Sequence, residues 1–248
     1  MNIPTVLRAR GYRLYTEGGR RLVDLWLNGG AAILGHTPAN MLRELKNTAS
    51  RGLYAPYPHF TQGRLLKALL KLFPGHSFRL YAAPPAELPE KIELWRPYSK
   101  ADKTPALFIP VLPGIQTWRN NLPLGMCIIA AKDESLLSGL PESDKLSPIL
   151  LAMAARGIHD IIAAPERAKL NLPRITKALK NSIWQQQGIY LTLKEAIAPE
   201  KWENLFNKFL EAGFLLPPAQ SHPLILPGEL SDGEEAKLAN MLAKQLTD

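Results

Sequence analysis

Side chains that commonly perform chemistry are few and scattered in this sequence. Its single cysteine, Cys127, cannot form an internal disulfide or a thiolate metal cage. No Ser-His-Asp order, paired-carboxylate motif or glycine-rich nucleotide loop is present. The five histidines do not have metal-ligand spacing, and we therefore expect no metal site at His36, His59, His76, His159 or His222.

Two short segments contain candidates for lining a cleft. The run Asn28-Gly29-Gly30 follows a predicted strand and can form either a substrate-facing loop or an ordinary glycine turn, and the turn is the favoured interpretation. Tyr54 lies close to Tyr57 and His59, an aromatic cluster that can face a cleft or pack on the surface.

Two further residues have side chains that could perform chemistry, but a structural role is the favoured interpretation for both. His36 has the side chain of a general base, yet it stands at a predicted junction between a strand and a helix. Cys127 lies in a predicted buried strand, where a lone cysteine usually acts as a small inert apolar residue.

Hydrophobic periodicity and the proline and glycine positions predict the elements that would position these residues. Alternating segments around a glycine turn predict a hairpin of residues 12–16 and 21–27. Helices are predicted where apolar residues repeat every three and four positions, over about 38–51, 63–73, 148–163, 170–186, 202–210 and 232–246. Short strands are predicted over 78–82, 106–112, 123–131, 214–216 and 223–226. The order indicates an α/β chain with an N-terminal hairpin and helices over residues 1–125 and an α+β module over 126–248.

Composition is that of a globular chain, with 248 residues, 46% hydrophobic and 21% charged. No apolar stretch reaches the roughly 20 residues of a membrane-spanning helix, so we expect a cytoplasmic protein without a membrane partner. The net charge of +8 comes from residues 1–75, which contain 11 basic and 3 acidic side chains. Because no basic run or basic-aromatic repeat accompanies this excess, a solvated basic face is favoured over nucleic-acid binding.

Several motifs occur in the order typical of one enzyme family. They are Gly11-Tyr12-Arg13-Leu14-Tyr15 through Asp24, Leu34-Gly35-His36-Thr37-Pro38, Arg51-Gly52, Leu122-Pro123-Leu124-Gly125, the segment 211–220, and Ser231-Asp232-Gly233-Glu234-Glu235. Together they resemble class III pyridoxal-phosphate aminotransferases, in the branch of glutamate-1-semialdehyde aminomutase. The resemblance implies a reduced fold-type-I chain, with a remnant of the large domain over 1–125 and the C-terminal small domain over 126–248. Only six residues separate the counterparts of Tyr98 and Pro105, where the family has a long catalytic domain.

The resemblance also locates the chemistry that the family requires. Its Schiff-base lysine corresponds to Gln116, which cannot form an aldimine and remains only a cleft candidate. Its phosphate-binding turn corresponds to Ala83-Pro84-Pro85-Ala86-Glu87, in which two prolines lack N–H donors and no hydroxyl is present.

Three hypotheses follow. The leading one is a truncated, non-catalytic relative without a cofactor, which binds or assembles as a homodimer or beside a full-length aminotransferase. The alternative is an aminotransferase or aminomutase that binds pyridoxal phosphate through an unrecognised lysine. The third is nucleic-acid binding by the basic first 75 residues. The resemblance implies a homodimer, because aminotransferases of this fold are dimers. The predicted helix 148–163 supports this expectation, since it is apolar on more than one face, although the centre of a folded core would also explain that pattern.

Overall fold

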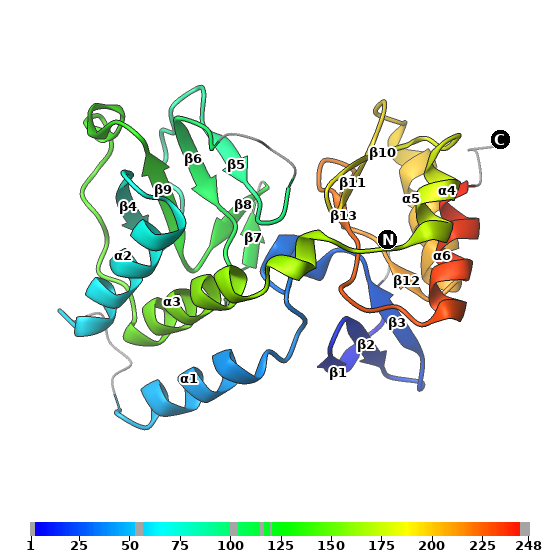
Figure 1. Ribbon diagram of the computed structural model, residues 1–248, viewed down its shortest axis with the longest axis horizontal. Coiled ribbons are helices and arrows are strands. Elements are labelled where there is room, and N and C mark those ends of the chain that lie inside the picture. The colour runs from blue at the N-terminus through cyan, green and yellow to red at the C-terminus, as the bar shows by residue number, and fades with distance from the viewer. Residues whose placement is uncertain (1–2, 53–56, 100–103, 115–116, 120, 244–248) are drawn as a thin grey trace.

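The computed structural model describes residues 3–52, 57–99, 104–114, 117–119 and 121–243 and shows a mixed α/β chain with two lobes (Figure 1). The terminal lobe joins both ends of the chain, residues 3–36 and 165–243, around one hydrophobic cluster. The middle lobe is built from the described residues between 39 and 163, around two further clusters. This packing differs from the expected division at residues 125 and 126, because the N-terminal hairpin packs with the C-terminal segments.

The terminal lobe opens with a four-stranded sheet in the order β1-β2-β3-β12. Its strands are β1 (Val6–Arg10), β2 (Arg13–Thr16), β3 (Arg21–Asp24) and β12 (Phe214–Leu215). The first three are antiparallel neighbours, and β12 from the far end of the chain pairs in parallel with β3. The predicted hairpin is confirmed, with Gly18 and Gly19 in the turn at φ angles of 86° and 78°. The edge strand β1 was not predicted.

A second sheet and three helices complete the terminal lobe. The sheet contains β10 (Trp184–Gln187), β11 (Tyr190–Leu193) and β13 (Leu224–Ile225), and the helices are α4 (Pro173–Leu179), α5 (Pro199–Glu211) and α6 (Asp232–Ala243). Helix α5 directs Trp202, Phe206 and Phe209 into the core, and the two phenylalanines are completely buried.

The predicted helix over 170–186 is wrong. This segment forms only the short helix α4 and then strand β10, after the 3-10 turn η3 (Pro165–Ala168). Pro173 begins α4 because proline is tolerated only in the first turn of a helix. The residues beyond α4 pair with β11 in an antiparallel hairpin, and this tertiary pairing overrides their helical propensity.

The middle lobe contains a four-stranded sheet in the order β4-β9-β6-β5. Its strands are β4 (Ser77–Tyr81), β5 (Glu93–Trp95), β6 (Leu107–Pro110) and β9 (Cys127–Ala131). Strand β9 is antiparallel to both neighbours, whereas β5 and β6 are parallel. The predicted strand over 123–131 is interrupted, because β8 (Leu122–Leu124) turns away to pair with β7 (Thr117–Arg119).

Three helices lie on one side of this sheet (Figure 1). They are α1 (Ala39–Ala49), α2 (Phe60–Leu72) and α3 (Pro148–Ala163), and α3 contacts both of the others. Side chains of β9 alternate between the two faces, with Ile128 and Ala130 facing the helices and Ile129 facing the turn η2 (Glu134–Leu137). Helix α3 is therefore covered within the chain itself and does not supply the uncovered apolar surface that would support the homodimer expectation.

Among the described residues, no single helix is long and apolar enough to cross a membrane. Helix α3 and the segment Pro165–Leu179 meet the length and composition criteria only as a pair bent by 69°.

Candidate functional site

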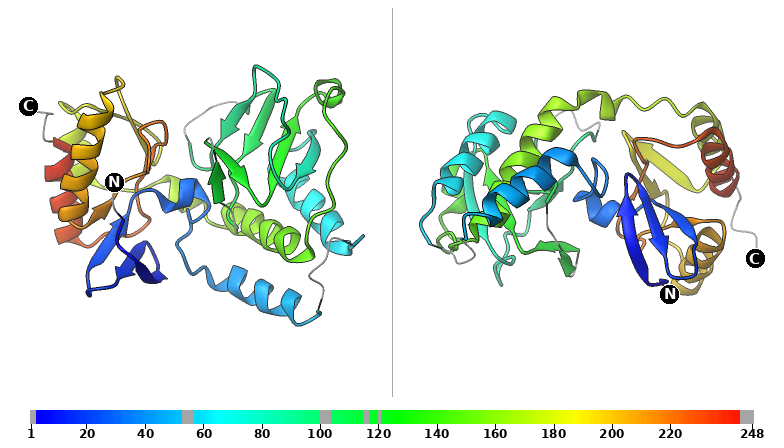
Figure 2. Two further views of the ribbon diagram at one scale, coloured as in Figure 1. Left: turned by 180° about the vertical axis from the view of Figure 1, so that it is seen from behind. Right: turned by 90° about the horizontal axis from the view of Figure 1, so that it is seen from below.

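The turn after β3 lies between the two lobes (Figure 2). It contains the 3-10 turn η1 (Leu27–Gly30), whose four residues all have positive φ, from 48° to 109°. The buried carboxylate of Asp24 holds its start, because Oδ1 accepts hydrogen bonds from the backbone N–H groups of Trp26 at 2.8 Å and Leu27 at 3.0 Å. Non-glycine residues in this conformation are strained, and such strain often accompanies functional sites.

The indole of Trp118 covers this turn. A Cβ atom added to Gly29 would lie 2.3 Å from the Trp118 ring, so glycine is required there by close approach as well as by φ. The indole Nε1 donates a hydrogen bond to the carbonyl oxygen of Asn28 at 2.9 Å. Through Trp118, the β7 segment of the middle lobe is thereby fastened to the turn.

His36 is joined to the same carboxylate. Its Nε2 atom lies 3.0 Å from Oδ2 of Asp24, and its backbone N–H donates to the carbonyl oxygen of Gly11 at 2.7 Å. Asp24 thus connects β3, the turn η1 and the imidazole of His36. This is the structural position that the sequence favoured for His36, although its ring also faces a cavity.

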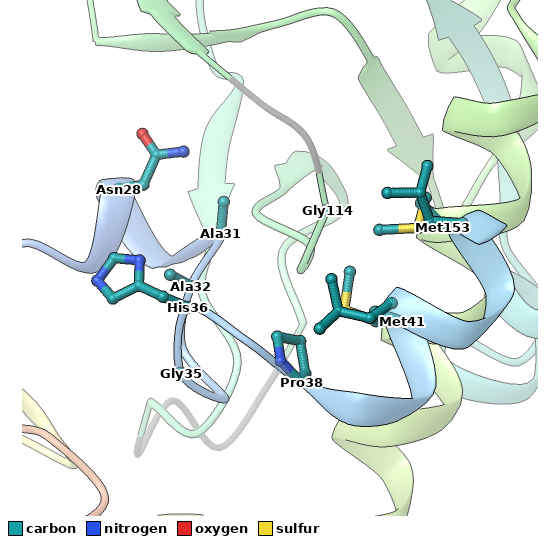
Figure 3. A pocket seen from close by; sticks show the side chains of 11 residues that line it. Asn28, Ala31, Ala32, Gly35, His36, Pro38, Met41, Gly114 and Met153 are labelled. Carbon is teal, nitrogen blue, oxygen red and sulfur yellow. The ribbon is translucent and has the colours of Figure 1, made fainter. Parts of the chain in front are cut away.

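We call this cavity, of about 240 Å³, the His36 cavity (Figure 3). It is lined by Asn28, Ala31, Ala32, Gly35, His36, Pro38, Met41, Leu42, Leu45, Gly114 and Met153. His36 and Asn28 lie at one side, whereas Met41 and Met153 lie at the opposite side (Figure 3). One end of the cavity is therefore polar and the other is apolar.

A second cavity of about 400 Å³, the Trp118 cavity, borders the same turn. It is lined by Trp26, Asn28, Thr117, Trp118, Asn121, Pro218, Ala219 and His222. The ring of His222 is 5.5 Å from that of Trp118 and 6.3 Å from that of Trp26, between centroids. Burial and the nearby Arg96 guanidinium lower the pKa of His222, which favours a neutral imidazole.

A buried arginine ties the segment after α3 to the turn. Arg167 is 5% exposed, and its Nε donates to the carbonyl oxygen of Ile33 at 3.1 Å. Its Nη2 donates to the carbonyl oxygen of Leu226, and its guanidinium carbon lies 5.4 Å from the centre of the Tyr12 ring. Burial lowers the pKa of Arg167, and no carboxylate of a described residue forms an ion pair with it.

The described residues do not fit pyridoxal phosphate. The connection between β4 and β5 contains no helix, and so no helix N-terminus is available for the phosphate. Within that connection Pro84 and Pro85 lack N–H donors and Ala86 lacks a hydroxyl. No lysine lines the His36 cavity or the Trp118 cavity, and Lys132 after β9 is exposed.

The remaining sequence candidates are dispersed. Tyr54 and Gln116 lie outside the described residues. Tyr57 is 68% exposed, and the ring of His59 caps the first turn of α2. Cys127 is buried, and burial raises the pKa of its thiol to about 12, which keeps it protonated.

Sequence reasoning did not single out three residues that organise this region, namely Asp24, Trp118 and Arg167. Asp24 was visible only as part of a family motif. The contacts of Trp118 and Arg167 join residues 90 and 134 positions apart, so no local pattern could reveal them.

Comparison with known proteins places this geometry in context. No known family profile matches the sequence. An uncharacterised protein of Treponema pallidum is 27% identical, with 90% of this chain and 88% of the relative covered. One of Borreliella burgdorferi is 25% identical, with 94% and 88% covered. Glutamate-1-semialdehyde 2,1-aminomutase of Lawsonia intracellularis is 37% identical over 67 residues, which are 27% of this chain and 16% of that protein.

Solved structures extend the similarity over almost the whole chain. Ornithine δ-aminotransferase of Plasmodium falciparum matches with a TM-score of 0.69 and 12% identity, covering 98% of this chain and 93% of that one. An ω-transaminase of Sphaerobacter thermophilus has a TM-score of 0.70 and 8% identity, with 97% and 90% covered. At such identities the likeness concerns the fold. The resemblance expected from the motifs is therefore confirmed, and the chain has the fold of the class III, fold-type-I aminotransferases.

Proposed function

We propose that this chain is a non-catalytic protein with an aminotransferase fold, and that it acts by binding or assembly as a homodimer. The observation that most strongly supports this is the helix-free connection between β4 and β5. The resemblance assigns the phosphate-binding turn to this connection, and its residues provide neither a hydroxyl at Ala86 nor N–H donors at Pro84 and Pro85.

The sequence at the lysine position supports the same proposal. Gln116, the counterpart of the Schiff-base lysine, has an amide that cannot form an imine. Among the described residues that line the two cavities beside the turn η1, no lysine could take its place. A protein that has the fold but lacks both the nucleophile and the phosphate turn is suited to binding rather than to amino transfer.

Exposed apolar side chains of the middle lobe support the homodimer. Leu42 of α1 and Phe60 and Leu70 of α2 are 40%, 55% and 47% exposed, and Tyr57 lies just before α2. Large apolar side chains exposed on α1 and α2, which both pack against α3, are candidates for a protein interface. We propose that a second copy covers them, with a total buried area above roughly 1,000 Å².

Reduction with borohydride after incubation with pyridoxal phosphate tests the loss of catalysis. We expect no aldimine absorption and no stoichiometric pyridoxyl adduct on any lysine peptide. A single lysine that is fully converted to the pyridoxyl adduct would contradict the proposal and identify the unrecognised lysine of an active enzyme.

Sedimentation at micromolar concentration tests the assembly. We expect the wild type to be a dimer. Phe60→Asp should convert it to a monomer, whereas Leu136→Asp, a control at another exposed site, should leave the dimer intact. A monomeric wild type would refute self-association. A full-length aminotransferase would then be the partner to test.

A further inference from the structure

We propose that the His36 cavity is a binding site for a small aliphatic monocarboxylate, with its carboxylate at His36 and its chain between Met41 and Met153. This inference deepens the proposed binding function and rests on it. It names the chemical class of a ligand for a cavity that lies beside the turn η1.

The polar end of the cavity has one nitrogen atom available to a ligand. Nε2 of His36 faces the carboxylate of Asp24, which is an acceptor and therefore fixes the ring proton on Nε2. No described residue forms a hydrogen bond with Nδ1 of His36. A carboxyl group that shares its proton with Nδ1 would therefore complete the hydrogen bonding of the ring, opposite the contact with Asp24.

The opposite end of the cavity offers only apolar contacts. Apart from Asn28 and His36, the lining side chains are those of alanine, proline, leucine and methionine, together with two glycines. Met41 and Met153 are 4% and 5% exposed and line this end from α1 and α3. Methionine adapts its shape to aliphatic groups, so this end suits an unbranched alkyl chain.

Charge favours an anion over a cation. None of the described lining residues is acidic, and the carboxylate of Asp24 beside His36 is already engaged by three hydrogen-bond donors. Residues 1–75, which contribute most of the lining, contain 11 basic and 3 acidic side chains. Pro38, which lines the cavity, is the N-cap residue of helix α1, and the first turn of this helix contains no acidic residue.

The cavity is large enough for both ends of such a ligand. Its volume of 240 Å³ is many times the roughly 10–15 Å³ that one water molecule requires, so a short alkyl chain fits beside a carboxylate. Hexanoate, a short unbranched acid, is therefore a suitable probe.

Isothermal titration of the full chain with hexanoate, hexan-1-ol and hexylamine tests the proposal. We expect saturable binding of hexanoate with one site per chain, binding of hexan-1-ol weaker by about tenfold because the charged hydrogen bond is lost, and no binding of hexylammonium. Equal affinity for the acid and the alcohol would overturn the anion site, and no saturable binding of hexanoate would overturn the proposal as a whole.

Matched variants locate the site. His36→Gln keeps an amide donor for Asp24 but removes the Nδ1 position, and we expect it to weaken hexanoate binding about tenfold. His159→Gln makes the same change on α3 outside the cavity and should leave binding unchanged. Should His36→Gln fail to fold, Leu42→Ala offers a second test, because Leu42 lines the cavity and is 40% exposed.

Leu42→Ala should weaken hexanoate but not acetate, whereas Leu136→Ala at a similarly exposed position of η2 should affect neither. An unchanged affinity of Leu42→Ala for hexanoate would place the binding elsewhere. These results are independent of borohydride trapping: a trapped lysine would refute the proposed function, whereas the absence of hexanoate binding would refute only the ligand class.

Discussion

The terminal lobe and the middle lobe relate differently to the aminotransferases whose fold they share. Most motifs of the resemblance lie in the terminal lobe and its turn, from Gly11 to Pro38 and from Glu211 to Glu235. Of the two departures that concern chemistry, the segment 83–87 lies in the middle lobe, and Gln116 is outside the described residues. The comparison agrees with our proposal that the packing of the chain ends is retained while the cofactor chemistry of the intervening region is lost.

Truncation of an aromatic residue in the terminal core should give the largest effect. Phe206→Ala removes a completely buried ring from α5, and we expect it to lower the free energy of unfolding by about 3–5 kcal/mol. Phe108→Ala removes an equally buried ring from the middle lobe. Because the hydrogen bond from Trp118 to Asn28 joins the middle lobe to the terminal lobe, urea unfolding should show one transition that both variants shift.

The partly buried Leu210 on the same helix provides a control, and Leu210→Ala should cost clearly less than Phe206→Ala. An unchanged melting temperature of Phe206→Ala would contradict the terminal core. Two separate transitions, with each variant moving only one, would show that the lobes are independent units.

The turn between the lobes provides the second test. Gly29→Ala places a Cβ against the Trp118 ring, and we expect it to cost about 1–3 kcal/mol more than Gly18→Ala. Gly18 also has positive φ, but a Cβ there meets no atom within 4 Å, so the pair separates contact from backbone strain. In a Trp118→Ala background, Gly29→Ala and Gly18→Ala should cost about the same stability. If Gly29→Ala still costs more in that background, Trp118 does not restrict Gly29.

An acid-sensitive contact fastens the hairpin to the last helix. Glu234 accepts hydrogen bonds from Arg13 at 2.6 and 3.0 Å. The Arg13 guanidinium is the largest cause that lowers the pKa of Glu234 from 4.5 to about 2. Since the folded pKa is the lower one, this stabilisation is complete above pH 4.5 and disappears as the pH falls toward 2.

We expect Glu234→Gln to lower the stability at neutral pH by about 1.5 kcal/mol and to flatten the loss of stability in acid. The exposed-site control Glu195→Gln should do neither. Urea unfolding at several pH values measures this sensitivity. If Glu234→Gln and the wild type lose stability equally in acid, other carboxylates cause the loss.

Local patterns predicted the elements whose signals lie within one segment. Ser147-Pro148 predicts the start of α3, and the predicted capping box of α6 is confirmed by reciprocal bonds between Ser231 and Glu234. Strand β10 was mistaken for helix because its partner β11 lies across a turn at Gly188, and pairing energy is invisible in a single-segment pattern. The division into lobes differed for the same reason, since β3 and β12 pair over nearly the whole length of the chain.

The same limit applies to the candidate site. The Asn28-Gly29-Gly30 turn was visible as a glycine pair after a strand, but its cover by Trp118 and its support from Asp24 depend on folding. The His36 cavity combines residues from the turn, from α1 and from α3, and only the tertiary structure brings them together.

The smallest expected effect is a null result at Gln116. Gln116→Lys restores the amine that the family uses, but the connection after β4 still lacks the hydroxyl and the N–H donors for the phosphate. We therefore expect no amino transfer and no reducible aldimine from this variant, in an assay where an active class III aminotransferase gives both. Measurable amino transfer by Gln116→Lys would show that one residue separates this chain from an enzyme. The contrast between the lobes would then lie in a single side chain rather than in the loss of the whole cofactor site.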